Sequence, residues 1–477
     1  MLNQFSVNSI FTSGLMKKFF CALLMSGVFA CNAGAQSIQP FKQGDRVVFM
    51  GNSITDGGHY HSYIWLYYIT HFPNRRMEVF NAGIGGDIAR QMYERLDGDA
   101  FAKKPTVMTL TFGMNDTGYQ NLKGPQADSA YKAKVNEALK SFGLITGKLK
   151  QHPEIRKIMI GSSPYDETSK IKTTPLMGKN AAMLRIVVEQ KSTAISNGWN
   201  FIDLNTPMTA INQSQQQKDS TFTMEGNDRI HPTNDGQMVM AYLFLKAQGL
   251  AGKKVSEVAL AVNSKQPLIA DNCKISLLSV TKNAVKFNYL ANSLPYPTDT
   301  IPGGFGKPAR SQADALKLIS FTDEFNQELL LVKGLTAGNY TLKIDGKVIG
   351  NWSADEYAAG INMALLKNTP QYQQALAIMH INEERWEIER RLREYYWIHY
   401  SILKPKGLLF NDGDATVDSL QKYARKDFFV AVTVPTYQKA RFKSVRDAWA
   451  QEIVLLTNQL YAINKPVTHR IEITQSK

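Results

Sequence analysis

The sequence predicts an α/β fold in which a parallel sheet is covered by helices on both faces. From Arg46 to about Gly249, short runs rich in Val, Ile, Phe, Thr and Met alternate with longer amphipathic stretches. Most of the short runs end in Gly, Ser or Asn. Strand–helix alternation is typical of parallel sheets, and right-handed crossovers then give a doubly wound sandwich. In such folds the ligand site lies beyond the carboxyl ends of the strands.

The individual elements follow from composition and periodicity. Strands are expected at Arg46–Gly51, Met77–Gly83, Thr106–Gly113, Lys157–Ser162 and Asn200–Leu204. Helices are expected near His61–His71, Asp87–Ala102, Asp128–Gln151, Asn180–Ser196 and Asp235–Gln248. Each strand run is short and rich in β-branched or large apolar residues, whereas each helical stretch exceeds ten residues.

After Gly252 the sequence pattern changes, from alternating strands and helices to a small group of strands followed by long helices. Strands are expected at Lys274–Leu290, Leu329–Lys333 and Tyr340–Ile349, with Asp345-Gly346 as a hairpin turn. A capping box begins at Ser353, and Thr369-Pro370 is typical of a helix start. That helix is expected to reach about Leu403, and a further helical stretch covers Tyr437–Ile463, while Leu294–Lys307 is expected to be a loop or linker.

These patterns divide the chain into three parts. We expect a signal peptide over residues 1–35, an α/β domain over 36–255, and a β plus helical accessory region over 256–477. The last region is either an independent domain or a cap over the α/β domain. The sequence does not indicate an oligomeric state.

Composition excludes several classes of protein. The 477 residues are 44% hydrophobic and 20% charged, which is ordinary for globular proteins. The formal net charge of +14 is spread along the chain, whereas a nucleic-acid-binding protein concentrates its positive charge. We therefore expect no nucleic-acid partner.

The amino terminus is typical of an exported protein. Lys17 and Lys18 precede the apolar run Phe19–Ala30, and small residues lead to Ala35, where cleavage is expected. The run is too short to span a bilayer, and no transmembrane segment is expected elsewhere. The alternative is a lipid anchor at Cys31, so the protein is expected to be periplasmic or secreted, or else a membrane-anchored lipoprotein.

Four blocks of polar residues and glycines carry the chemistry. They are Gly51-Asn52-Ser53, Gly83-Ile84-Gly85-Gly86-Asp87, Gly113-Met114-Asn115-Asp116 and Asp228-Arg229-Ile230-His231. Three of them follow predicted strands, and the fourth precedes the last predicted helix of the α/β part. Taken singly, each block is equally well read as a turn or a helix cap. In the last block, a carboxylate three residues before a histidine could orient its ring.

The ordered combination of these blocks resembles the SGNH (GDSL-like) hydrolase superfamily, over roughly Val47–Gly249. The resemblance implies a three-layer sandwich with a five-stranded parallel sheet of flavodoxin-like type. It also implies Ser53 as nucleophile, His231 as general base and Asp228 as the residue that orients His231. The oxyanion hole would comprise the backbone amides of Ser53 and Gly86 and the side-chain amide of Asn115. One departure is Asn52, where the family usually has Asp.

Other side chains are candidates for substrate binding. His59 follows the serine block, while Tyr165 and Asp166 follow the fourth strand and could bind a sugar hydroxyl. The alternatives are a helix-start histidine and a loop cap. The aromatic cluster around Trp386 and Trp397 is expected to pack in the core, and the arginines at 390, 391 and 393 are expected to form a solvated face.

The sequence therefore predicts an exported serine esterase, and the resemblance favours a carbohydrate O-acetylesterase. Its partner would be a small-molecule or polysaccharide ester. The alternatives are a lipid esterase or thioesterase, and a carbohydrate-binding protein without turnover. The mechanism requires no metal and no cofactor, because amides hold the oxyanion.

Overall fold

Five parallel strands form a central sheet in the order β2-β1-β3-β4-β5. The computed structural model describes residues 38–121, 124–304 and 308–476. The expected signal peptide and the alternative lipid anchor at Cys31 lie outside these residues. The strands are β1 Arg46–Gly51, β2 Glu78–Gly83, β3 Val107–Phe112, β4 Arg156–Gly161 and β5 Asn200–Asp203. All five predicted strands are confirmed within one or two residues.

The central sheet is buried on both faces. Alternate residues of β1 enter different cores: Val47 and Phe49 pack with helices α2 Tyr60–His71 and α7 Asn234–Ala247. Val48 and Met50 pack with the helices on the other face, α3 Ala89–Arg95, α4 Pro125–Lys150 and α5 Lys179–Ser196. The period of two along the strand thus separates the two cores, and the predicted three-layer α/β fold is confirmed.

Each of the five helices predicted along this sheet corresponds to an observed one, but two observed helices, α1 and α6, were not predicted. Helix α6, Asn205–Gln216, directly follows β5, and the sequence analysis did not anticipate it. The stretch predicted as one helix over Asp87–Ala102 is helix α3 followed by a π-helical turn, Leu96–Ala100, and a 3₁₀ turn, Phe101–Lys103. A four-residue helix, α1 Ser53–Asp56, follows β1.

Two further sheets follow the α/β part. A four-stranded sheet has the order β13-β10-β6-β7, and a five-stranded antiparallel sheet has the order β12-β11-β14-β9-β8. Their strands are β6 Ser256–Ala261, β7 Ile269–Asp271, β8 Cys273–Val280, β9 Ala284–Ala291, β10 Glu328–Lys333, β11 Asn339–Ile344, β12 Lys347–Ser353, β13 Ile361–Asn362 and β14 His469–Gln475. The two sheets share one apolar core.

The predicted hairpin turn and helix starts in this region are confirmed. Asp345 and Gly346, between β11 and β12, both have positive φ, as a two-residue hairpin turn requires. Ser353 caps α9, Ala354–Ala359, with Glu356 completing the capping box. Thr369 caps the long helix α10, Pro370–Trp397, and a short helix, α8 Phe321–Phe325, precedes β10.

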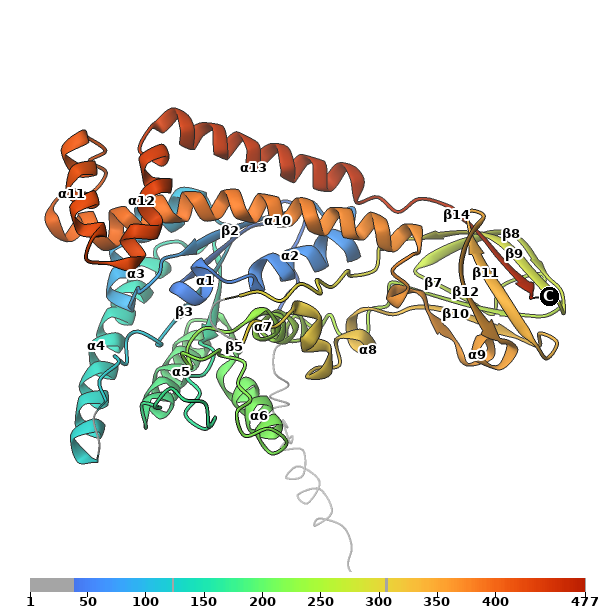
Figure 1. The fold of residues 1–477 in the computed structure, drawn as a ribbon, viewed down its shortest axis with the longest axis horizontal. Coiled ribbons are helices and arrows are strands. Elements are labelled where there is room, and N and C mark those ends of the chain that lie inside the picture. Colours follow the sequence, from blue (N-terminus) through green and yellow to red (C-terminus); the bar gives the residue numbers. More distant parts are fainter. Residues whose placement is uncertain (1–37, 122–123, 305–307, 477) are drawn as a thin grey trace, which may run out of the picture. The chain divides into compact units, whose positions relative to one another are not determined.

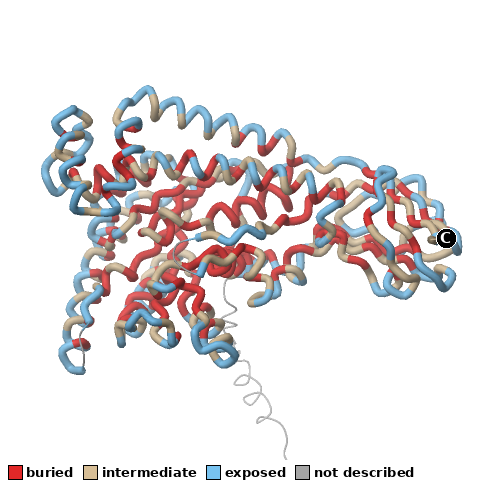
Figure 2. The backbone as a smooth tube through the Cα atoms, in the orientation of Figure 1, coloured by how far each residue is buried: buried red, intermediate tan, exposed pale blue. Residues whose placement is uncertain are grey.

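Helix α10 continues as a π-helical turn over Ile398–Leu403 and leads into three more helices. These are α11 Asp414–Ala424, α12 Phe428–Ala440 and α13 Lys443–Ile463. Where one helix was expected over Tyr437–Ile463, the chain breaks at Arg441 and Phe442. Helix α13 returns along α10, and most of its residues face solvent (Figures 1 and 2).

Helix α10 packs on the α/β part rather than standing apart from it. Ala375, Ile378 and Met379 of α10 join the apolar core formed by α2 and α7. Tyr461 of α13 accepts a hydrogen bond from the indole of Trp65 in α2, at 3.1 Å. The described part of the chain contains no helix with the length and apolar character needed to cross a membrane. The domain boundary at 255/256 stays a prediction.

Candidate active site

Ser53 lies at the carboxyl end of β1, as the first residue of helix α1. The preceding residue, Asn52, caps this helix: its Oδ1 accepts a hydrogen bond from the Ile54 amide at 3.1 Å. Asn52 therefore supplies the capping acceptor that an Asp would supply, without the charge. Because the cap is Asn52, the Ser53 hydroxyl is not used as a cap, and its Oγ lies 2.8 Å from Nε2 of His231.

His231 bridges Ser53 and Asp228. Its Nδ1 lies 2.6 Å from Oδ2 of Asp228, while the other carboxylate oxygen accepts the backbone amides of Ile230 and His231. Since a carboxylate only accepts, Nδ1 carries the proton, and Nε2 is left to accept the proton of Ser53. Burial alone would raise the pKa of Asp228, but the bonds and charge of His231 and the two amides lower it. Asp228 is thereby kept ionised.

The loop that holds this pair is anchored by Arg229, which sequence analysis did not single out. Arg229 is buried and has a positive φ of 66°. Its guanidinium donates to the carbonyl oxygens of Asp166, Ile171 and Thr173. These bonds tie the Asp228–His231 turn to the loop after β4, and so fix the position of the histidine.

Gly86 and Asn115 belong to the loops that follow β2 and β3. Gly86 has a positive φ of 86°, where a residue with a Cβ would be strained. Within the described residues, its amide donates to no protein acceptor. The side-chain amide of Asn115 donates to the Asp87 carbonyl at 2.9 Å, so it lies beside the Gly86 loop.

Asp116 links the two loops that carry Gly86 and Asn115. Its carboxylate accepts the amide of Ala89, at the start of α3, at 2.8 Å and the amide of Gly113 at 2.9 Å. Burial raises the pKa of Asp116 to about 6, although these amides act in the opposite direction. The Asn115 loop is also supported by the buried Lys179, whose Nζ donates to Met114, Thr117 and Gly118. Burial lowers the pKa of Lys179 to about 7.

A small pocket, with a volume of about 10 Å³, opens beside Ser53 and His231. His59 lines it, as do Gly57, Gly58, Asn234 and Gln237. The His59 ring stacks on Trp386 of α10 at 4.0 Å, and its Nδ1 lies 3.3 Å from Glu383. The structure thus brings His59 to the pocket, and its role in substrate binding stays a prediction.

Tyr165 and Asp166 have contacts that differ from the predicted ones. The Tyr165 hydroxyl is buried and accepts the Leu176 amide at 3.0 Å. Asp166 is also buried; its carboxylate accepts from Thr168, Ser169 and Gln216. Both side chains hold the loop after β4 together, which is the loop-cap alternative. The polar atoms of both side chains are engaged within the protein, and their role as sugar contacts stays a prediction.

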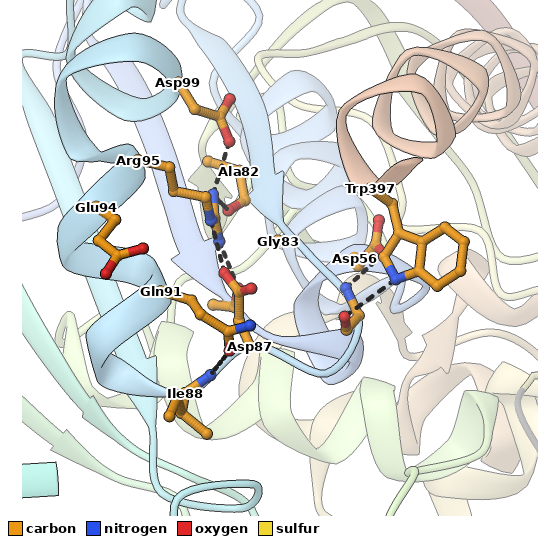
Figure 3. A network of polar contacts seen from close by, with 12 residues as sticks. Asp56, Ala82, Gly83, Asp87, Ile88, Gln91, Glu94, Arg95, Asp99 and Trp397 are labelled. Atoms are coloured by element: carbon orange, nitrogen blue, oxygen red, sulfur yellow. Dashed lines mark hydrogen bonds and ion pairs between the residues drawn. The ribbon is translucent and has the colours of Figure 1, made fainter. Parts of the chain in front are cut away.

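A buried charge network lies behind the Gly83–Asp87 loop (Figure 3). Arg95 pairs with Asp87 and Asp99, at 2.6 Å each, and donates to the carbonyl oxygens of Gly51 and Ala82. It therefore joins the ends of β1 and β2. Burial raises the pKa of Asp87, against the charge of Arg95. Asp87 is thus part of an ion pair and not the turn cap that the sequence alone also allowed.

The network extends to α10 through Arg393. This arginine is buried, donates twice to the Gly83 carbonyl, and forms a bidentate pair with Asp99 in which both distances are 2.8 Å. The expectation that Arg393 lies on a solvated face was wrong, because its partners come from a part of the chain about 300 residues earlier. Trp386 is buried, as expected, whereas Trp397 is only half-buried and packs against a small core cluster. However, their indoles donate to the Gly58 and Gly85 carbonyls, next to Ser53 and Gly86.

Comparison with known proteins gives two family matches. The model of the GDSL-like lipase/acylhydrolase family matches residues 49–239, and that of the diltiazem deacetylase C-terminal helical domain matches residues 376–465. The structure of a gut microbial diltiazem-metabolizing enzyme is 50% identical, with a TM-score of 0.89, and the alignment covers 93% of this chain and all of that one. An acetylxylan esterase from Geobacillus stearothermophilus is 23% identical over 225 residues, which are 43% of this chain and 94% of that protein.

Proposed function

Because the chain belongs to the GDSL-like lipase/acylhydrolase family of SGNH hydrolases and is an esterase of that type, we propose that it removes O-acetyl groups by serine catalysis. Ser53 is the nucleophile, His231 the general base and Asp228 the residue that orients His231. The observation that carries this proposal is the pair of contacts made by His231, 2.8 Å to Ser53 and 2.6 Å to Asp228.

The reaction follows from this geometry in two halves. Ser53 Oγ attacks the ester carbonyl while its proton passes to Nε2 of His231, and the imidazolium that forms is stabilised by the Asp228 carboxylate. The tetrahedral oxyanion is held by the amides of Ser53 and Gly86 and by the side-chain amide of Asn115. Its collapse releases the alcohol, which takes the proton from His231, and leaves acetyl-Ser53. Water then attacks this intermediate while His231 takes its proton, and the oxyanion is held by the same three amides. Its collapse releases acetate, and His231 returns the proton to Ser53 Oγ.

Two observations support acetate as the acyl group. The pocket beside Ser53 is small and is lined partly by glycines and by polar side chains rather than by a long apolar wall. Two of the matches also point to acetyl esters: one relative is named for acetylxylan, and the family model that matches residues 376–465 is named for a diltiazem deacetylase. These observations weigh against the lipid esterase and thioesterase alternatives.

For the alcohol part of the substrate, acetylated carbohydrate is the first candidate, as the resemblance to acetylxylan esterases favours. A second candidate is an acetylated small molecule, supported by the diltiazem-metabolizing enzyme that matches nearly the whole chain. The two candidates share the same chemistry at Ser53 and differ only in the leaving alcohol.

The proposal is tested with the 4-nitrophenyl esters of acetate, butyrate and octanoate, comparing wild type with Ser53→Ala. We expect acetate to be hydrolysed fastest, and all turnover to vanish in the variant. A preference for octanoate would contradict the acetyl assignment, and turnover in Ser53→Ala would contradict the nucleophile. Acetylated xylo-oligosaccharide and diltiazem, assayed by released acetate, then distinguish the two alcohols. Tight glycan binding without turnover by wild type would favour the carbohydrate-binding alternative.

Export is part of the same proposal and rests on the amino-terminal pattern. Cleavage after Ala35 places the mature amino terminus at Gln36, whereas a lipoprotein would begin at a lipidated Cys31. Mass spectrometry of the amino-terminal peptide from cell fractions distinguishes these. Recovery of the full-length chain in the cytoplasm would contradict export.

A further inference from the structure

Strand β2 is an edge strand of the central sheet, and α10 covers its open side. Three side chains of α10 reach the backbone of β2 and of the loop that follows it. Glu389 accepts the Asn81 amide at 2.8 Å, Arg393 donates to the Gly83 carbonyl, and the Trp397 indole donates to the Gly85 carbonyl at 3.1 Å. The edge is thus satisfied by side chains where another strand would otherwise pair.

The spacing of these contacts has a geometric cause. The three helix residues are four apart, which places them on one face and about 6 Å apart along the axis. The three backbone positions are two apart, which corresponds to about 6.6 Å along a strand. Because the two repeats nearly match, the helix follows the strand in register past its end. The third contact therefore falls on the loop and not on the sheet.

Gly85 is held from both sides in that loop. Its amide donates to Oδ2 of Asp56 at 3.0 Å, and its carbonyl accepts the indole N–H of Trp397 (Figure 3). A Cβ on Gly85 would lie 3.4 Å from Nε1 of Trp397 and 3.5 Å from Oδ2 of Asp56, which are ordinary van der Waals contacts, so the two hydrogen bonds rather than steric crowding hold this residue. The Gly85 carbonyl belongs to the same planar peptide unit as the Gly86 amide. In a trans peptide the C=O and N–H bonds point in opposite directions.

We propose that Trp397 is a positioning residue for catalysis, because its indole fixes the Gly85–Gly86 peptide so that the Gly86 N–H points at the oxyanion. This inference rests on the proposed function, in which Gly86 is an oxyanion donor. A hydrogen bond accepted at one end of a peptide also strengthens the donor at its other end. The carboxyl-terminal helical segment thereby becomes part of the esterase site, since it acts through the Gly86 amide.

The test compares Trp397→Phe with Trp65→Phe. Trp65 is a matched control, since its buried indole also donates one hydrogen bond between the α/β part and the carboxyl-terminal helices, to Tyr461. Each variant is assayed for kcat and KM with 4-nitrophenyl acetate, and for inhibition by phenylboronic acid. Boronic acids add to the serine and place a negatively charged oxygen in the oxyanion hole.

For Trp397→Phe we expect kcat to fall about 10-fold, with KM within about twofold and a similar loss of boronate affinity. Trp65→Phe is expected to keep all three values within about twofold while its melting temperature falls. A Trp397→Phe enzyme with wild-type kcat and boronate affinity would overturn the inference, as would losses equal to those of Trp65→Phe. If Trp397→Phe does not fold, 3-benzothienylalanine is placed at this position instead, because it keeps the ring shape and replaces the N–H by sulfur. The same changes in kcat, KM and boronate affinity are then expected of that variant, and the same results would overturn the inference.

The outcome separates this inference from the proposed function. An inactive Ser53→Ala together with an unaffected Trp397→Phe would overturn only the role of Trp397. Turnover that persists in Ser53→Ala would instead remove the serine mechanism, and the positioning role would fall with it.

Discussion

Replacing Arg393 with Met should destabilise the protein severely, although arginines on a long amphipathic helix are usually exposed. The guanidinium is buried and donates to Gly83 and to both oxygens of Asp99. Burial pushes the pKa of Asp99 up, but the charges of Arg393, Lys103 and Arg95 hold it well below its usual range. Arg393→Met would leave this buried carboxylate short of one cation and remove both of the arginine's bonds to the Gly83 carbonyl.

Breaking a buried pair costs about 3–5 kcal/mol, because the remaining charge stays desolvated. Here Arg95 and Lys103 still neutralise Asp99, so we expect the lower part of that range, about 3–4 kcal/mol. Arg390, three residues earlier, offers a matched control. Its side chain is 38% exposed and, among the residues that the structure describes, pairs only with Glu387 and Glu394 of its own helix. Arg390→Met should therefore cost less than about 1 kcal/mol.

The assay is urea unfolding at pH 7, followed by far-ultraviolet circular dichroism, for both variants and for Arg393→Met combined with Asp99→Asn. The double variant should recover part of the lost stability, since it removes the charge that the single variant strands. A cost below about 1 kcal/mol for Arg393→Met, equal to that of Arg390→Met, would refute the argument that this network holds α10 to the sheet.

Three further predictions follow from the site and its surroundings. Asn115→Ala should lower kcat by about 10²–10³-fold with 4-nitrophenyl acetate, with the fold kept by circular dichroism, because one oxyanion donor is lost; a change below about threefold would exclude Asn115 from the oxyanion hole. Burial raises the pKa of Glu225 to about 8, from 4.5 in the unfolded chain. The folded state therefore holds an extra proton between these values, and the stability present at pH 4.5 is lost as the pH rises through 8. Glu225→Gln should remove this loss, raising stability at pH 9 by a few kcal/mol relative to wild type while changing it little at pH 5; parallel urea midpoints at the two pH values would contradict it. Deleting residues 264–477 should give insoluble or inactive protein, because the helices that cover α2 and the edge of β2 are removed; a folded, active remainder in a solubility and esterase assay would disprove their role in the site.

Much of the α/β part was predictable because its signals are local. Each strand of the central sheet is a short apolar run that ends in glycine or a polar residue, and parallel strands bring those ends to one edge. Ser53, Asn115 and His231 could be recognised because each lies in a short block at such an edge. The contacts of His231 with Ser53 and Asp228 depend on how the loops fold. The sequence blocks indicate which residues come together, but not the geometry of their contacts.

Side-chain direction was not predictable in the same way. Tyr165 and Asp166 were correctly placed after β4, but whether they face the pocket or the loop depends on partners such as Leu176 and Gln216. Helix α6 was missed because its sequence, NTPMTAINQSQQ, is rich in polar residues and has few apolar ones to mark a buried face. Strand β14 was missed because it pairs with β9 and β11, whose residues lie far earlier in the chain.

The roles of Glu389, Arg393 and Trp397 illustrate the same limit at the active site. Their spacing of four is visible in the sequence, and it indicates one helix face. What that face meets is not visible, because the backbone groups of Asn81 and Gly83 become available only when β2 takes the edge of the sheet.

If Trp397 has the proposed positioning role, edge protection and catalysis use the same helix in this protein. An uncovered edge at β2 would expose backbone groups that favour aggregation, so a covering element stabilises the sheet whatever its function. Because the loop that carries Gly86 continues directly from this edge, a helix that follows the strand in register also reaches the loop. The inner contacts of α10, at Asn81 and Gly83, then act on stability, whereas the outermost contact, at Gly85, acts on the oxyanion donor. Substitutions along α10 should therefore shift from costs in unfolding free energy at Glu389 and Arg393 to a cost in kcat at Trp397. A single profile of stability and kcat along these three positions measures that gradient.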